Sequence, residues 1–180
     1  MKVFVGYDTR EDIAYQVCKH SLESRNKDVK VIPLIQHTLR KQGWYTRPID
    51  KLASTEFTFT RFLIPELTNF NGWALFCDSD IIFLNDVKEL FDQVDDKYAV
   101  MCVKHDYTPK EGTKMDGQTQ TVYPRKNWSS VMLVNCSHLS NKKLNFNDFI
   151  AISNAAVPLD TATEYLLPIK LNVDAGDFTI

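Results

Sequence analysis

Apolar residues occur along the chain in short runs that have the length and composition of buried strands. Five runs rich in β-branched and aromatic residues predict strands at Lys2–Gly6, Val29–Leu34, Trp73–Cys77, Tyr98–Val103 and Ser130–Asn135. None approaches the ~20 apolar residues that a membrane-spanning helix needs. The runs therefore predict the strands of a folded domain and no transmembrane segment.

Helical spacing appears between these strands. The first predicted helix is capped by Thr9 or Asp8 and ends near Leu22, and its apolar stripe is made by Ile13, Ala14, Val17, Cys18 and Leu22. The other predicted helices are Ser54–Leu67, with Pro65 at or beyond its last turn, Val87–Phe91 and Leu144–Ile152; the predicted loops are 36–52 and 105–126. Strands that alternate with helices predict an α/β fold, Rossmann-like, with a mostly parallel central sheet flanked by helices.

Composition narrows the class of protein. The chain has 21 Lys and Arg against 23 Asp and Glu, a net charge of −2, so no basic excess favours a nucleic-acid partner. A hydrophobic content of 44% over 180 residues predicts a single globular domain covering 1–180. No apolar leader follows Met1, so we expect a cytoplasmic protein.

Two carboxylates directly follow the predicted buried strand Trp73–Cys77. In an extended segment alternate side chains share a face, so Asp78 and Asp80 are expected to converge on one cation. Oxygen ligands suit Mg²⁺ or Mn²⁺, which commonly bind together with a substrate diphosphate. The alternative is that Asp78 caps a turn and Asp80 is solvated.

Four segments resemble the GT-A-fold glycosyltransferases of family 8. They are Val3–Asp8, Phe57–Pro65, Trp73–Phe83 and Trp128–Asn135, in the order that the family has them. The short chain also resembles the compact enzymes of bacteria and of large algal viruses, for which the location would be the host cytoplasm. The resemblance covers roughly residues 1 to 140.

This resemblance implies a role for each matching residue. Gly6, Tyr7 and Asp8 would meet the uracil base, Arg61 the sugar diphosphate, Ser79 the ribose, and Ser129 and Ser130 the donor sugar. Asp78 and Asp80 would bind Mn²⁺ or Mg²⁺, and Asp80 and Asp160 would be the catalytic carboxylates. The alternatives are a strand-end aromatic for Tyr7, a helix-surface cation for Arg61 and a helix N-cap for Asp160.

The chain departs from the family at two places. Trp128-Ser129-Ser130 stands where the family has Asn-Ser-Gly, which puts the contacts to the donor sugar in doubt. The family's C-terminal His-x-x-Gly-x-x-Lys-Pro-Trp segment, whose His closes the metal shell, has no counterpart before Ile180. We therefore expect the chain to be one domain of a longer protein.

The resulting hypothesis is a metal-dependent glycosyltransferase. It would move a sugar from a UDP-sugar to a hydroxyl acceptor, such as a glycoprotein or lipopolysaccharide-type glycan, with retention of configuration. One alternative, a sugar-phosphate nucleotidylyltransferase, would carry a Gly-rich loop where this chain has Gly6 alone. The other is an inactive module that binds nucleotide sugars. The loop 105–126 is predicted to order over the donor as a lid.

Overall fold

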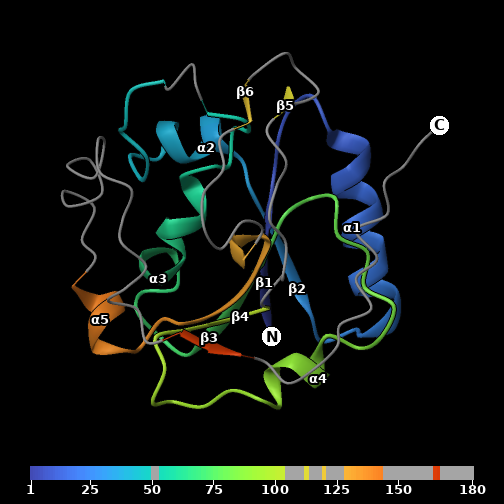
Figure 1. Ribbon diagram of the computed structural model, residues 1–180, viewed down its shortest axis with the longest axis vertical. Coiled ribbons are helices and arrows are strands. Elements are labelled where there is room, and N and C mark those ends of the chain that lie inside the picture. Colours follow the sequence, from blue (N-terminus) through green and yellow to red (C-terminus); the bar gives the residue numbers. More distant parts are fainter. Residues whose placement is uncertain (50–52, 104–111, 114–118, 121–127, 144–163, 167–180) are drawn as a thin grey trace.

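A six-stranded sheet forms the centre of the molecule, in the strand order β2-β1-β3-β7-β4-β8 (Figure 1). The computed structural model describes residues 1–49, 53–103, 112–113, 119–120, 128–143 and 164–166. The sheet strands are β1 (Lys2–Gly6), β2 (Lys30–Leu34), β3 (Trp73–Cys77), β4 (Val100–Cys102), β7 (Val131–Asn135) and β8 (Glu164–Leu166). β5 (Gly112–Thr113) and β6 (Thr119–Gln120) form a separate antiparallel pair. The five predicted strands are all present.

The sheet is mixed, with one reversed strand near its middle. β1 runs parallel to both β2 and β3, and β4 runs parallel to β8. β7 is antiparallel to its neighbours β3 and β4. The α/β class and the mainly parallel pairing are therefore confirmed. Because β7 is reversed, its amino end lies beside the carboxyl end of β3.

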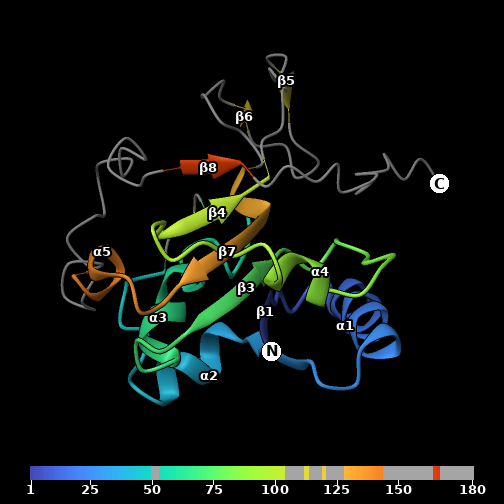
Figure 2. The ribbon, with the colours of Figure 1, turned by 90° about the horizontal axis from the view of Figure 1, so that it is seen from below.

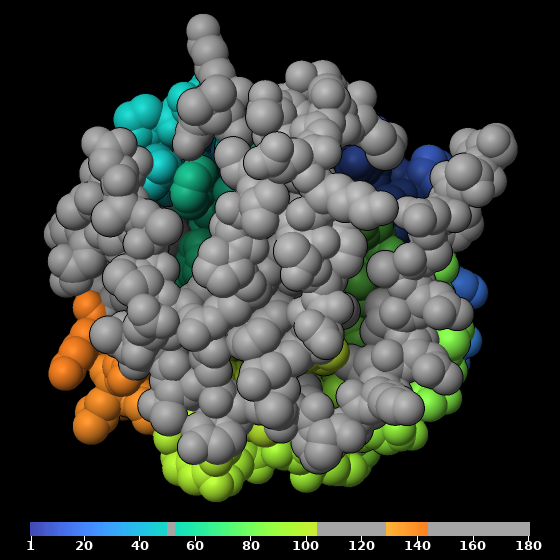
Figure 3. Space-filling view, viewed as in Figure 1, coloured from blue at the N-terminus to red at the C-terminus, as the bar shows by residue number. Residues whose placement is uncertain are grey.

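Short helices lie on both sides of the sheet. They are α1 (Asp12–Arg25), α2 (Gln36–Lys41), η1 (Thr60–Leu63), α3 (Ile64–Leu67), α4 (Lys88–Phe91), η2 (Trp128–Ser130) and α5 (Leu139–Lys142). Figure 2 shows α1 and α4 on one side and α2 and α3 on the other. In the space-filling view, the segment from α4 to β4 forms the lower rim of the molecule and α5 lies at its lower left (Figure 3). No helix in the described ranges has the length and apolar composition needed to cross a membrane.

Alternate residues of the strands supply two apolar layers. Val3, Val5, Leu75, Cys77 and Leu133 pack with buried side chains of α1 and α4. Phe4, Phe76, Ala74, Met132 and Val134 pack with side chains of α2, η1 and α3 on the opposite face. Because both faces are covered, the strands read as continuous apolar runs, which is why the sequence revealed them.

The predicted position of the first helix is wrong. α1 begins at Asp12, and Ile13 and Val17 are 76% and 46% exposed. Its buried face is made by Tyr15, Cys18, Ser21 and Leu22. The physical reason is that Asp8–Glu11 form a turn held by the Asp8 carboxylate, which accepts from the backbone N of Arg10. The helix therefore starts later, and of the predicted stripe Cys18 and Leu22 are buried whereas Ile13 and Val17 are not.

Further differences lie in the second layer. The predicted loop 36–52 contains the helix α2. The predicted helix Ser54–Leu67 is instead a series of turns followed by η1 and α3, and Pro65 lies in the first turn of α3 rather than in a last turn. A proline is tolerated there because the first helical N–H groups have no partner within the helix. The predicted helix Leu144–Ile152 and most of the predicted lid lie outside the described residues.

Candidate functional site

The topology places the predicted site residues at the carboxyl ends of the neighbouring strands β1 and β3, which we call the site edge of the sheet. In the parallel pair of β1 and β3, Val5 is opposite Cys77, so both strands end at the same level. In the antiparallel pair, Cys77 is opposite Val131, so β7 begins there. Ligands of α/β sheets bind outside the carboxyl ends of parallel strands. This edge therefore brings together the segments 6–8, 78–80 and 129–130.

The backbone after β3 does not continue as an extended strand. Ser79 and Asp80 lie in a turn, so the predicted alternation of side chains on one face is wrong here. The backbone N of Asp78 donates to the carbonyl of Ser130 (2.9 Å), which ties this turn to the start of β7. Ser79 is buried, and its hydroxyl has no hydrogen-bond partner among the described residues. Asp80 is exposed.

Arg61 is the central cation of this edge. Its Nη1 donates to the carbonyl of Ser129 (2.7 Å), and its Nη2 lies 3.2 Å from Oδ1 of Asp78. The guanidinium also lies over the Phe76 ring, 4.6 Å from the centroid. Its side chain is only 10% exposed, which excludes the alternative of a helix-surface cation. Arg61 thus joins η1, the end of β3 and η2.

The Asp78 carboxyl is in an environment that disfavours its charge. Burial raises the pKa of Asp78 to about 7, and repulsion from Asp80 and Glu11 acts in the same direction, while Arg61 opposes the rise. A quarter of the side chain remains exposed, so incoming groups can reach it. A cation bound here would offset both the burial and the repulsion.

These residues fit a divalent cation that also binds a diphosphate. Oδ1 of Asp78 is buried, makes no hydrogen bond to the described residues and has the guanidinium of Arg61 as its charged neighbour. No group of three metal-ligating side chains occurs in the part of the chain that the structure describes. Mg²⁺ commonly takes one or two carboxylates and completes its shell with water and substrate phosphates. Asp78 and Asp80 are carboxylates of the kind that such a shell uses.

Gly6 and Tyr7 lie at the carboxyl end of β1. The Tyr7 hydroxyl donates to Oδ1 of Asp12 (2.9 Å), and its ring meets Tyr15 edge-on at 5.3 Å. The hydrogen bond with Asp12 raises the pKa of the Tyr7 hydroxyl. A Cβ at Gly6 would lie 2.4 Å from the Phe57 ring, so this position needs glycine for a close approach. The ring of Tyr7 stays partly exposed, as stacking on a base requires.

Asp8 has a structural role that conflicts with the predicted one. Its side chain is fully buried, and its carboxylate accepts from Arg10 N (3.0 Å), Nε (2.9 Å) and Nη2 (2.8 Å) and from Glu56 N (3.1 Å). The Arg10 side chain is the main cause that lowers the pKa of Asp8 to about 2. Both oxygens thus accept two hydrogen bonds within the chain, so this side chain has no free acceptor for the uracil base that the resemblance assigns to Asp8.

Sequence reasoning missed several residues of this edge. Arg10 and Phe57 position the β1 end, and Glu11 adds a third negative charge near Asp78. Arg10 carries a local signal, since it stands two residues after Asp8, whereas the contact of Phe57 with Gly6 spans two elements and leaves no pattern. Asp160 lies outside the described residues, so its predicted catalytic role is untested.

Comparisons with known proteins give one close relative in sequence. Protein CDI of Arabidopsis thaliana is 60% identical over 144 residues, which are 79% of this chain and 56% of that protein. The chain therefore spans little more than half the length of this curated relative. No protein-family model matches the sequence.

Solved glycosyltransferases share the fold. The glycosyltransferase GlyE of Streptococcus pneumoniae TIGR4 matches with a TM-score of 0.58 and 16% identity, over 93% of this chain and 45% of that one. The galactosyltransferase LgtC, in complex with donor and acceptor sugar analogues, matches with a TM-score of 0.53 and 13% identity, over 84% of this chain and 64% of that one. At such identities the likeness concerns the fold alone, and the chain has the GT-A glycosyltransferase fold.

Proposed function

We propose that this chain is the donor-binding part of a metal-dependent glycosyltransferase that uses a UDP-sugar. The observation that carries the proposal is the Arg61 guanidinium, held over Phe76 between the Ser129 carbonyl and the Asp78 carboxylate. A planar guanidinium fork suits phosphate oxygens, and the carboxylates beside it suit a cation. The GT-A fold of the chain also supports glycosyl transfer.

Each of these residues would contact a different part of a nucleoside diphosphate. Tyr7 offers a ring to the base at the end of β1, and Ser79 offers an unpaired hydroxyl beside the carboxylates. Asp78 and Asp80 would hold Mn²⁺ or Mg²⁺, which supplies positive charge to the diphosphate as the glycosidic bond breaks. Arg61, 3.2 Å from Asp78, adds a further positive charge. Together they favour departure of UDP.

The stereochemistry and the acceptor follow from the family 8 resemblance. Retention with front-face attack, in which the leaving phosphate takes the proton of the acceptor hydroxyl, needs no protein nucleophile. We also propose that Asp160 is a catalytic carboxylate, that the metal has a third protein ligand, and that the acceptor is a glycan. The cytoplasmic location and a single domain over 1–180 are part of the same proposal. Because the chain covers only 56% of its curated relative, the activity of the complete protein is also a proposal.

Calorimetry of UDP binding tests the metal site. Wild type should bind UDP more tightly with Mn²⁺ than with EDTA, and Asp78→Asn and Asp80→Asn should each remove that difference. Glu89→Gln, an exposed carboxylate on α4, is the matched control and should bind as wild type. Metal-dependent binding that survives both Asp substitutions would overturn the site.

A panel of UDP-sugars with Mn²⁺ then separates the enzyme from its alternatives. Release of UDP from one donor supports the transferase. Tight UDP-sugar binding without release supports the inactive binding module. Formation of a UDP-sugar and pyrophosphate from UTP and a sugar 1-phosphate would instead identify a nucleotidylyltransferase.

A further inference from the structure

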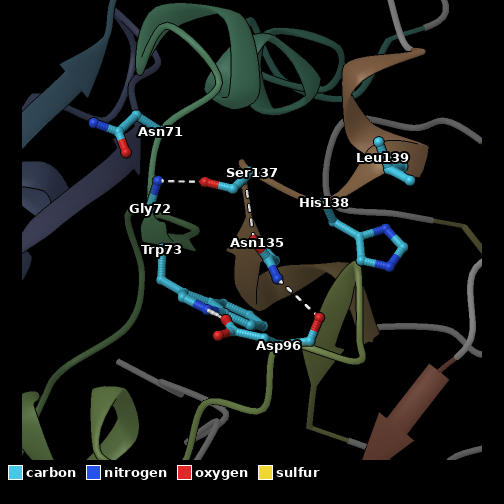
Figure 4. A pocket seen from close by; sticks show the side chains of 8 residues that line it. All are labelled: Asn71, Gly72, Trp73, Asp96, Asn135, Ser137, His138 and Leu139. Carbon is cyan, nitrogen blue, oxygen red and sulfur yellow. Dashed lines mark hydrogen bonds between the residues drawn. The ribbon is translucent and has the colours of Figure 1, made fainter.

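A cavity lies at the end of β3 that is away from the proposed transfer site. It has a volume of about 500 Å³ and is formed where β3 begins and β7 ends, as Figure 4 shows. Trp73 opens β3 and Asp78 follows its end, a separation of about 16 Å at 3.3 Å per residue. Trp73 is also paired with Asn135, the last residue of β7. The cavity is therefore distinct from the proposed transfer site, although the same two strands connect them.

The walls of the cavity are held in place by hydrogen bonds between three segments. Nε1 of Trp73 donates to the Asp96 carboxylate (2.9 Å), and Nδ2 of Asn135 donates to the Asp96 carbonyl (3.4 Å). The hydroxyl of Ser137 accepts from Gly72 N (2.8 Å), and Ser137 N donates to Oδ1 of Asn135 (3.2 Å). The site is thus ordered before any ligand arrives.

Several polar groups of this cavity keep capacity for a ligand. The Asp96 carboxylate is exposed and retains lone pairs beyond those that meet Trp73, and the Ser137 hydroxyl keeps its proton to donate. Nδ1 of His138 accepts from Ser140 N (3.2 Å), so the neutral ring carries its proton on Nε2. The amide of Asn71 lies exposed at the rim. The cavity therefore presents both donors and acceptors beside a partly buried indole.

We infer that this cavity binds an uncharged oligosaccharide. Closely spaced donors and acceptors match vicinal hydroxyls, and a partly exposed indole gives the apolar surface on which a sugar ring packs. Of the residues lining it, in the described part of the chain, Asp96 carries the only permanent charge, and this negative charge disfavours phosphates and nucleotides. The volume lies within the about 300–1,000 Å³ typical of small-molecule sites.

NMR titration tests the inference without nucleotide or metal. Maltotriose, cellotriose and xylotriose are added separately at millimolar concentration to the isotope-labelled protein, and glucose 6-phosphate serves as the anionic comparison. At least one trisaccharide should shift the Trp73 indole signal and the Gly72 amide, and glucose 6-phosphate should shift neither. No shift with any trisaccharide, or shifts confined to Tyr7 and Asp78, would overturn the inference.

Variants locate the binding and separate it from the proposed transfer. Asp96→Ala and the rim variant Asn71→Ala should each weaken trisaccharide binding, by about ten-fold for Asp96, as expected for loss of a hydrogen bond to a charged group. Trp44→Ala removes a tryptophan outside the cavity and should leave the affinity unchanged. Asp80→Asn should also leave it unchanged, so this site and the UDP site can fail independently. An affinity unaffected by both cavity variants would overturn the assignment.

Discussion

The carboxylate of Asp78 lies 3.2 Å from the guanidinium of Arg61, yet its pKa is raised rather than lowered. The burial that comes with its place at the end of β3 outweighs the attraction of the neighbouring cation, and Asp80 and Glu11 add repulsion. An ion pair that leaves a carboxyl so reluctant to ionise is incompletely compensated. The arrangement is suited to receiving more positive charge.

The first prediction is that ionisation of Asp78 opposes folding in the absence of metal. Its pKa is raised from 3.8 to about 7, so its contribution to stability is greatest at low pH and is lost as pH rises through this window. The free energy of unfolding of Asp78→Asn should therefore rise relative to that of wild type between pH 4 and 8. The expected rise is roughly 1–3 kcal/mol after allowance for partial exposure. Urea denaturation across this pH range measures the difference.

The control for this experiment is the exposed Glu89→Gln, which should follow the wild-type profile. A difference between Asp78→Asn and wild type that stays constant with pH would contradict the prediction. A loss of stability that grows toward pH 8 would show instead that the Arg61 pair dominates.

The second prediction concerns Asp8, whose shift has the opposite sign. Arg10 lowers its pKa to about 2, so its contribution is complete above pH 4 and is lost as pH falls through 2. Asp8→Asn should cost about 1–2 kcal/mol at pH 7, a discounted value because Arg10 is half exposed. The cost should shrink in urea melts at pH 2. An equal cost at both pH values would assign Asp8 a packing role only.

The third prediction uses the contact of Gly6 with Phe57. Gly6→Ala places a Cβ 2.4 Å from the buried Phe57 ring and should destabilise the fold by about 1–3 kcal/mol. Phe57→Leu should recover part of that loss, which a double-mutant cycle measures as coupling. At Gly43 an added Cβ would meet no atom within 4 Å, so Gly43→Ala should destabilise the fold only through the positive φ of that residue. Phe57→Leu should not recover this loss. Strictly additive effects at Gly6 and Phe57 would contradict the contact.

Sequence reasoning succeeded where the pattern is local and failed where contacts between elements decide. β1 and β3 coincide with their predicted ranges because, after its first residue, each strand is buried on both faces and reads as an uninterrupted run. α1 was misplaced because the turn that delays it depends on the burial of Asp8 against the backbone of Glu56, 48 residues away. Its exposed Ile13 and Val17 imitate a core stripe.

The site shows the same division. Asp78 was selected from its place after a buried strand and Arg61 by resemblance, and the parallel pairing of β1 with β3 explains why Tyr7 lies close to the end of β3. The burial that turns Asp8 into a structural anchor, and the proximity of Glu11 to Asp78, come from the turn between β1 and α1. No periodicity in the sequence encodes that turn.

The last prediction tests whether the shape of Arg61, beyond its charge, matters. An ammonium is a compact charge, so Arg61→Lys cannot place two separate nitrogens on the Ser129 carbonyl and the Asp78 carboxylate as the guanidinium does. UDP affinity with Mn²⁺ should fall about ten-fold, equivalent to ~1.4 kcal/mol, and fall further in Arg61→Ala.

Calorimetry with Mn²⁺ measures these affinities, and urea denaturation reports the accompanying stability. A control exists in Arg25, the last residue of α1, whose Nε donates to the carbonyl of Leu84 (2.8 Å) and whose Nη1 donates to that of Ser21 (3.1 Å). Arg25→Lys should reduce stability without changing UDP affinity, because it loses a two-point guanidinium contact that lies away from Asp78 and Asp80. If Arg61→Lys binds UDP as wild type does, a single positive charge suffices, and the fork geometry is not what the nucleotide uses.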